Sequence, residues 1–181
     1  MSGNNYMTMG TAVGTAVGIF VGLIICIFVF KAMNKDGKMK TKYDEMQILV
    51  RGKAYQYAFW TMMGLEALML VLDSGNIQLP WEGFISHLII ILIAVLVQVS
   101  YSIWNDGYIG LNTNMGRFGV FAVCISLFNF LVAGGAIANG KMVVDGRLQT
   151  PAANLFCGVL FIIIGIEIFL KKVADNGQKE D

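Results

Sequence analysis

Five stretches of apolar residues, each long enough to cross a lipid bilayer as a helix, constrain this chain more than any other feature of its sequence. A helix rises about 1.5 Å per residue, so roughly 20 residues cross a hydrocarbon core of about 30 Å. Only 14% of the residues are charged, whereas a soluble domain carries about 25%. The sequence therefore predicts an all-α integral membrane protein that forms a single membrane domain, residues 1–181. Its five transmembrane helices are expected at residues 10–30, 54–72, 84–104, 118–138 and 153–170.

The distribution of basic residues predicts how these helices are oriented. Lys and Arg favour the cytoplasmic side of a membrane when they lie in short loops. Of the 13 Lys and Arg residues, all but Lys141 and Arg147 fall on one side of the predicted membrane. That side comprises segments 31–53, 105–117 and 171–181. The N-terminus is therefore expected outside and the C-terminus in the cytoplasm. No basic residue precedes Lys31, so the first stretch is interpreted as an uncleaved anchor.

The first predicted helix carries glycines at every fourth position. Residues four apart share one face of a helix, and small residues in lipid allow two helices to approach closely. We therefore expect a helix-contact stripe, which packs either on the protein's own helices or on another subunit. It consists of Gly10, Gly14, Gly18 and Gly22.

Several polar side chains lie inside the other predicted helices. A charge near the bilayer centre costs about 2.5–3.5 kcal/mol on insertion scales, so such groups usually pair or face the interior of a bundle. Glu66 and His87 lie at similar depths on consecutive helices and are expected to hydrogen-bond. Glu167 lies near the inner boundary, within reach of Arg51, Lys53 or Arg117.

The third and fourth predicted helices both carry a stripe of small and polar residues, which suggests that they face each other. Gln98 follows His87 on the third helix, and Asn129 lies on the fourth. One interpretation is a route for a proton or solute through Glu66, His87, Gln98 and Asn129. The other is hydrogen bonding between helices for structure alone, worth about 0.6 kcal/mol per contact.

The connecting segments carry local signals. Residues 31–40 are basic and contain glycine, so we expect them to be flexible. The second helix is expected to extend into the cytoplasm from about residue 42, with Thr41 or Asp44 as its N-cap. On the other side of the membrane, Asp145-Gly146 predicts a short β-hairpin, which we expect to pack on the helix ends because an isolated hairpin is only marginally stable.

The segment YDEMQILVRGKAYQYAFW, residues 43–60, resembles a motif of small bacterial multi-pass membrane proteins that have no assigned activity. In that motif "YDERQ" is followed after a few residues by "RGKAYKYAF". The matching positions include Asp44, Glu45, Gln47, Arg51 and Lys53, whereas Met46 and Gln56 replace basic residues. The resemblance implies a bacterial plasma membrane and supplies no catalytic residues. From the residues themselves, this juxtamembrane segment either contacts anionic lipid headgroups or binds a partner protein.

No pattern in the sequence points to chemistry. There is one histidine and no GxSxG, HExxH or P-loop motif, so an enzyme is not expected. Cys26, Cys124 and Cys157 lie in apolar stretches without a CxxC pair, which disfavours a metal site. No cofactor and no nucleic acid are expected. Two functions remain open: an accessory or regulatory membrane subunit that acts through helix contacts, alone as a homo-oligomer or with a partner, and a small oligomeric transporter or channel.

Overall fold

The computed structural model describes residues 13, 16–17, 20–21, 24, 27–29, 31–38 and 40–177. The chain forms two compact units. A smaller unit comprises Met1–Lys42 with Leu111–Asn114, and a larger, helical unit comprises Tyr43–Gly110 with Met115–Asp181. Most of the described residues are helical.

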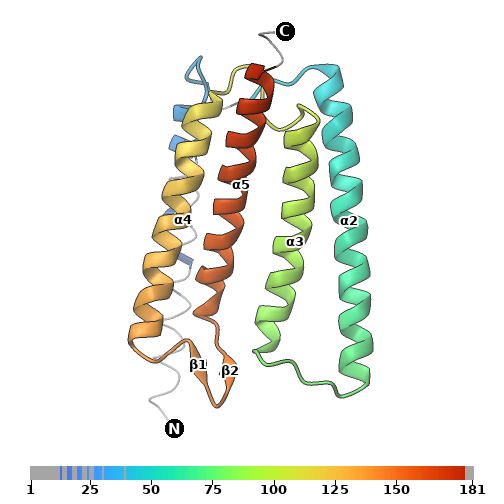
Figure 1. Ribbon diagram of the computed structural model, residues 1–181, viewed down its shortest axis with the longest axis vertical. Helices are drawn as coiled ribbons and strands as arrows, with labels where there is room; N and C mark the ends of the chain where they lie inside the picture. The colour runs from blue at the N-terminus through green and yellow to red at the C-terminus, as the bar shows by residue number, and fades with distance from the viewer. Residues whose placement is uncertain are drawn as a thin grey trace. The chain divides into compact units, whose positions relative to one another are not determined.

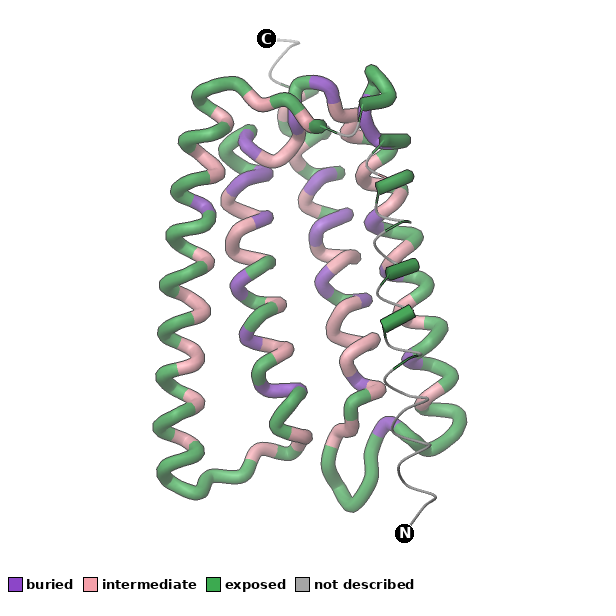
Figure 2. The backbone as a smooth tube through the Cα atoms, turned by 180° about the vertical axis from the view of Figure 1, so that it is seen from behind, coloured by how far each residue is buried: buried purple, intermediate pink, exposed green. Residues whose placement is uncertain are grey.

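Four long helices form the helical unit. They are α2 (Glu45–Ser74), α3 (Gly83–Trp104), α4 (Met115–Ala138) and α5 (Ala152–Gly177). Helix α2 packs on α3, α3 packs on α5, and α5 packs on α4, so the helices stand side by side in the order α2, α3, α5, α4 (Figure 1). Exposed positions run along all four helices when the same arrangement is seen from behind (Figure 2). Within this unit, α2 and α4 are therefore edge helices.

Three of the described helices, α3, α4 and α5, are long and apolar enough to cross a membrane. They cover the third, fourth and fifth predicted spans. Helix α2 covers the second predicted span, residues 54–72, but it is not among the three. Gln56, Glu66 and two tyrosines, Tyr55 and Tyr57, lower its hydrophobicity. The first predicted span, residues 10–30, lies largely outside the described residues. The described structure thus has three helices with the character of membrane spans, not five.

The N-terminus of α2 is fixed by its own sequence. The Asp44 carboxylate accepts a hydrogen bond of 2.7 Å from the backbone N–H of Gln47, and the Gln47 side chain accepts one from the backbone N–H of Asp44. This reciprocal capping box satisfies two N–H groups that lack helical partners. Asp44, rather than Thr41, is the N-cap, and the helix begins at Glu45.

Helix α5 lies between α3 and α4, so the prediction that the third and fourth helices face each other is wrong (Figure 1). Branched side chains of α3 and α5, including Val99 and Ile164, form one buried cluster. On the other side of α5, the Ser126 hydroxyl of α4 donates 2.8 Å to the carbonyl of Gly158. A Cβ atom at Gly158 would lie only 2.9 Å from the Phe130 ring. Small residues therefore allow α4 and α5 to approach closely.

The predicted hairpin is present, with β1 (Val143–Val144) paired antiparallel to β2 (Arg147–Leu148). Asp145 and Gly146 have φ values of 49° and 74°, as a two-residue hairpin turn requires. The hairpin is joined to the α2–α3 connection. Leu148 donates through its N–H to the carbonyl of Pro80 and accepts through its carbonyl from the N–H of Glu82, both at 3.0 Å.

In the smaller unit, Asn112 organises the segment that follows Met33. Its amide nitrogen donates to both carboxylate oxygens of Asp36, at 3.1 and 3.2 Å, and to the carbonyl of Lys40. Its side-chain oxygen accepts 2.8 Å from the N–H of Lys42. The backbone N–H of Lys38 also donates to Asp36, and this hydrogen bond is the main cause that lowers the pKa of Asp36. Hydrogen bonds to Asn112 thus hold Asp36, Lys40 and Lys42 together, and the flexibility expected for residues 31–40 stays a prediction.

Candidate functional site

The structure brings together two of the predicted intramembrane polar residues. The Nδ1 atom of His87, near the start of α3, lies 3.1 Å from both carboxylate oxygens of Glu66 on α2. The His87 side chain is 56% exposed and that of Glu66 is 36% exposed. The pair therefore joins two helices at an open surface of the unit, where the other edge of the imidazole stays accessible.

A polar cavity of about 270 Å³ adjoins this pair at the end of α2 and α3 where the hairpin lies. Its walls come from α2, the α2–α3 connection, α3 and β2. Asp73 lies in the last turn of α2, Ser86 and His87 in the first turns of α3, and Arg147 in β2. The Arg147 guanidinium donates to the side-chain oxygen of Gln78 in the α2–α3 connection. The cavity is thus built by the same contacts that attach the hairpin to this connection.

The other two members of the predicted polar route lie elsewhere. Asn129, on the edge helix α4, donates 2.9 Å to the carbonyl of Ile125 in its own helix. Gln98 lies about three turns along α3 from His87, and its backbone carbonyl accepts a hydrogen bond of 2.7 Å from the Ser102 hydroxyl. Of the four route residues, only His87 lines the cavity. The described structure joins Glu66 to His87 and leaves Gln98 and Asn129 outside that site.

Glu167 accepts a hydrogen bond from a hydroxyl group on a neighbouring helix. The Ser100 hydroxyl of α3 donates 2.8 Å to Oε1 of Glu167 on α5. The second oxygen, Oε2, is buried and has no hydrogen-bond partner. Arg51, one of the basic residues expected near Glu167, instead lies 4.2 Å from the centre of the Tyr43 ring and donates to the Tyr43 and Tyr55 hydroxyls.

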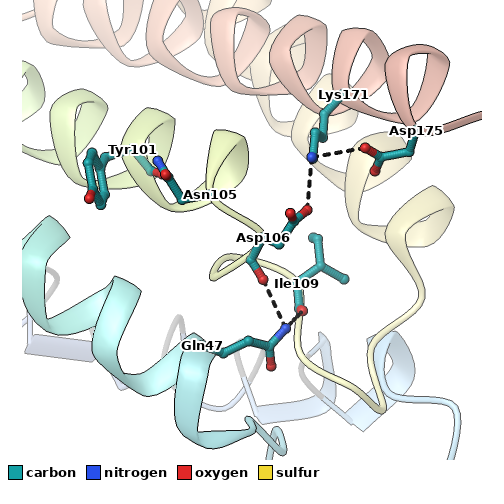
Figure 3. A network of polar contacts seen from close by, with 7 residues as sticks. All are labelled: Gln47, Tyr101, Asn105, Asp106, Ile109, Lys171 and Asp175. Carbon is teal, nitrogen blue, oxygen red and sulfur yellow. Dashed lines mark hydrogen bonds and ion pairs between the residues drawn. The ribbon is translucent and has the colours of Figure 1, made fainter. Parts of the chain in front are cut away.

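The juxtamembrane motif joins α2 to the α3–α4 connection (Figure 3). The Gln47 amide nitrogen donates to the carbonyls of Asp106 at 2.9 Å and Ile109 at 3.0 Å. A Cβ atom at Gly107 would lie 2.5 Å from the Val50 side chain, so only glycine allows this approach. The charged motif residues Asp44, Glu45 and Lys53 are exposed.

Asp106 extends this joint to α5 (Figure 3). Its carboxylate pairs with the Lys171 ammonium at 2.9 Å, and Asp175 pairs with the same ammonium at 2.9 Å. A cavity of about 190 Å³ lies among these side chains. The neighbouring Tyr108 is half-buried, and its partial burial raises the pKa of its hydroxyl well above the usual range. The motif and Asp106 therefore hold three helices at one end of the unit.

The glycine stripe and the cysteines, the other features considered in the sequence, take no part in the contacts described above. The glycine stripe, Gly10, Gly14, Gly18 and Gly22, lies outside the described residues. Cys124 is exposed on α4 and Cys157 is half-buried, both with free thiols. Within the described ranges, no group of three His, Cys, Asp or Glu side chains is arranged to hold a metal ion.

Sequence reasoning assigned no site role to Asp73, Asp106 or Arg147, and it expected Trp81 only as an anchor at the membrane interface. Arg147 carried a usable signal, because it is one of only two basic residues on its side of the predicted membrane. Asp106 carried another, because Asp-Gly after the end of a predicted helix favours a tight turn. Comparisons with protein-family models, curated proteins and solved structures find no match for this chain.

Proposed function

We propose that this chain is a multi-pass protein of the bacterial inner membrane that acts as a non-enzymatic accessory or regulatory subunit through lateral helix contacts. In this proposal the chain crosses the bilayer five times, with its N-terminus outside and its C-terminus in the cytoplasm. The observation that carries the proposal is the edge position of α2. It has one neighbour, α3, among the described helices of its unit, yet it is less apolar than the other three.

The outward side of α2 is better suited to another helix than to lipid tails. Gln56 and Gly64 are exposed in the middle of the helix, and a Cβ atom at Gly64 would meet nothing within 4 Å. Exposed Trp60 and Leu68, one turn before and one turn after Gly64, flank this small residue with large apolar side chains. Because lipid tails are as apolar as leucine, close packing beside small residues and polar contacts drive helix association in membranes.

Disulfide cross-linking tests this proposal. In a chain whose three cysteines are replaced by alanine, Gly64→Cys is expected to form a cross-linked dimer or a heavier adduct on mild oxidation in native membranes. Ile166→Cys is the matched control, because Ile166 is 52% exposed on α5, away from the edge helix. Equally low cross-linking of both variants would contradict the proposal that α2 makes a lateral contact.

A second candidate is a small oligomeric transporter or channel, favoured by the Glu66–His87 pair beside a polar cavity. In that case a proton or solute passes Glu66, His87, Gln98 and Asn129. Flux into proteoliposomes would then depend on the Glu66 carboxylate. Flux that Glu66→Gln leaves unchanged would exclude that role for Glu66.

The basic residues of the smaller unit support a membrane-surface role on the cytoplasmic side. Lys31, Lys35, Lys38 and Lys40 are all exposed. Juxtamembrane Lys and Arg each contribute about 1 kcal/mol to the attraction of a segment to an anionic leaflet. We therefore assign anionic headgroups of the inner face as partners of residues 31–53.

A further inference from the structure

The cavity at the end of α2 and α3 is lined by both an acidic and a basic side chain, Asp73 and Arg147, and this combination carries an inference beyond helix contacts. We propose that the cavity binds a small zwitterion with an ammonium and a phosphate group, supplied by the headgroup of an ethanolamine phospholipid. The lipid source rests on the membrane location proposed above. The chemistry of recognition rests on the residues of the cavity itself.

One side of the cavity is suited to a cation. Asp73 lies in the last turn of α2 and lines the cavity. The C-terminal end of a helix carries a partial negative charge, which favours a cation at this place. Asp73 is exposed, and its carboxylate forms no ion pair in the part of the chain that the structure describes. An ammonium group with N–H donors can therefore pair with it.

Other lining residues are suited to a phosphate. Arg147 supplies a guanidinium group, and His87 supplies the imidazole edge that faces away from Glu66. Helix α3 begins here, and its N-cap, Glu82, makes no side-chain hydrogen bond to the first turn. The Glu82 carboxylate instead accepts from the N–H and hydroxyl of Thr150, at 2.8 and 2.6 Å. Uncapped N–H groups at a helix start favour a bound anion.

The first residue of α3 also leaves room for that anion. Gly83 lines the cavity, and a Cβ atom there would meet nothing within 4 Å. The cavity of about 270 Å³ is several times the roughly 30 Å³ that one water molecule takes in the liquid. A phosphate and an ammonium linked by two carbons can therefore lie between the two helix ends.

Apolar residues in the same walls favour a lipid over a free solute. Met69, Ile77 and Leu79 line the cavity together with the polar groups. Trp81 also lines it, with its indole N–H donating 2.8 Å to the Ser86 hydroxyl. Tryptophan is enriched where a membrane protein meets the headgroup region. A headgroup could enter the polar part while its glycerol and first chain carbons lie on the apolar rim.

Lipid retention in nanodiscs tests the proposal on the full-length protein. The discs contain equal amounts of phosphatidylethanolamine, phosphatidylcholine and phosphatidylglycerol, and native mass spectrometry counts the lipids that stay bound. Phosphatidylcholine is the matched lipid, because its quaternary ammonium has no N–H to donate to Asp73. We expect preferential retention of phosphatidylethanolamine. Asp73→Asn and Arg147→Gln should each lower that preference about tenfold, as loss of one charge-assisted hydrogen bond implies.

Two control variants carry the same charge changes at the same end of the molecule. Asp145→Asn lies in the hairpin turn and Lys141→Gln precedes the hairpin, and neither residue lines the cavity. Both should keep the preference of the wild type. Arg147→Lys should retain part of it, which separates loss of charge from loss of the hairpin structure.

The outcomes separate the possible sources of the ligand. Cavity-dependent binding of soluble phosphoethanolamine without any lipid preference would assign the same chemistry to a free zwitterion. Equal retention of all three lipids with no binding of phosphoethanolamine would overturn the proposal, as would an equal loss in the control variants. Cross-linking of Gly64→Cys measures the lateral contact separately, so it can persist when the headgroup site fails.

Discussion

Three side-chain contacts show how single polar residues are accommodated in helices of this apolarity. Glu66 meets His87 between α2 and α3, Ser100 meets Glu167 between α3 and α5, and Ser126 donates to a carbonyl of α5 from α4. Each of the three helix-helix contacts therefore contains at least one polar bond. Such bonds cannot be replaced by water inside a bilayer, so they also fix which helices are neighbours.

At the residue scale, the Ser100 contact is open to a direct test. Ser100→Ala removes the donor to Glu167, whose other oxygen is already buried without a partner. An unsatisfied buried acceptor costs about 1–3 kcal/mol, so we expect a lower melting temperature in detergent. Ser102→Ala is the control on the same helix, because the Ser102 hydroxyl bonds only to its own helix, at the Gln98 carbonyl. Equal destabilisation by the two variants would contradict a specific role of the Ser100 bond.

The sequence allows some of these residue contacts to be predicted and hides others. Glu66 and His87 can be paired because both are costly in an apolar helix and lie at matching depths. The partner of Glu167 is hidden, because a serine such as Ser100 is common in membrane helices and carries no distinct signal. The prediction that Asn129 joins the polar route is not supported by a contact in the structure, because its side-chain amide donates to the Ile125 carbonyl of its own helix.

At the scale of elements, the beginning of α2 is held by the juxtamembrane motif. Gln47 takes part in the capping box and also donates to two carbonyls of the α3–α4 connection. Asp106 accepts one of these bonds and pairs with Lys171 of α5. The motif thus has two structural roles: Asp44 caps the start of α2, and Gln47 ties that start to the α3–α4 connection. The cap could be predicted from the sequence, but the distant carbonyls could not, because backbone acceptors have no sequence signature.

The anchoring of α2 leads to a second stability prediction. Gln47→Ala should destabilise the protein by about 1–2 kcal/mol, because it removes hydrogen bonds to the connection and half of the capping box. Gln56→Ala, at an exposed position of the same helix, should stay within about 0.5 kcal/mol of the wild type. Thermal unfolding in one detergent gives both values. A Gln47→Ala protein as stable as Gln56→Ala would show that the joint does not hold α2.

At the scale of the whole molecule, the hydropathy of the sequence predicts where the helices lie along the chain but not which helices are neighbours in space. α3, α4 and α5 are apolar enough to be recognised as possible spans from composition alone. The placement of α5 between α3 and α4 depends on close approach at Gly158 and on branched side chains such as Ile164. These features are visible only after packing, because almost every residue of such helices is apolar and the amphipathic pattern that orients helices in water is weak.

The arrangement of the helical unit also places its two polar ends apart. The cavity with Asp73 and Arg147 lies at the end of the α2–α3 connection and the hairpin, and the joint around Asp106 lies at the other end of α3 (Figure 1). If the helices cross a bilayer, these ends meet different compartments. In the orientation proposed above, the Asp106 end, which carries the excess of basic residues, is the cytoplasmic one.

Cysteine labelling of intact cells tests this membrane-spanning arrangement most directly. In a cysteine-free chain, Ser74→Cys lies at the cavity end of α2 and Lys172→Cys lies near the end of α5, both at exposed positions. A membrane-impermeant maleimide should label Ser74→Cys in intact cells and Lys172→Cys only after permeabilisation. Equal labelling of both positions in intact cells would contradict a chain that crosses the membrane in this orientation.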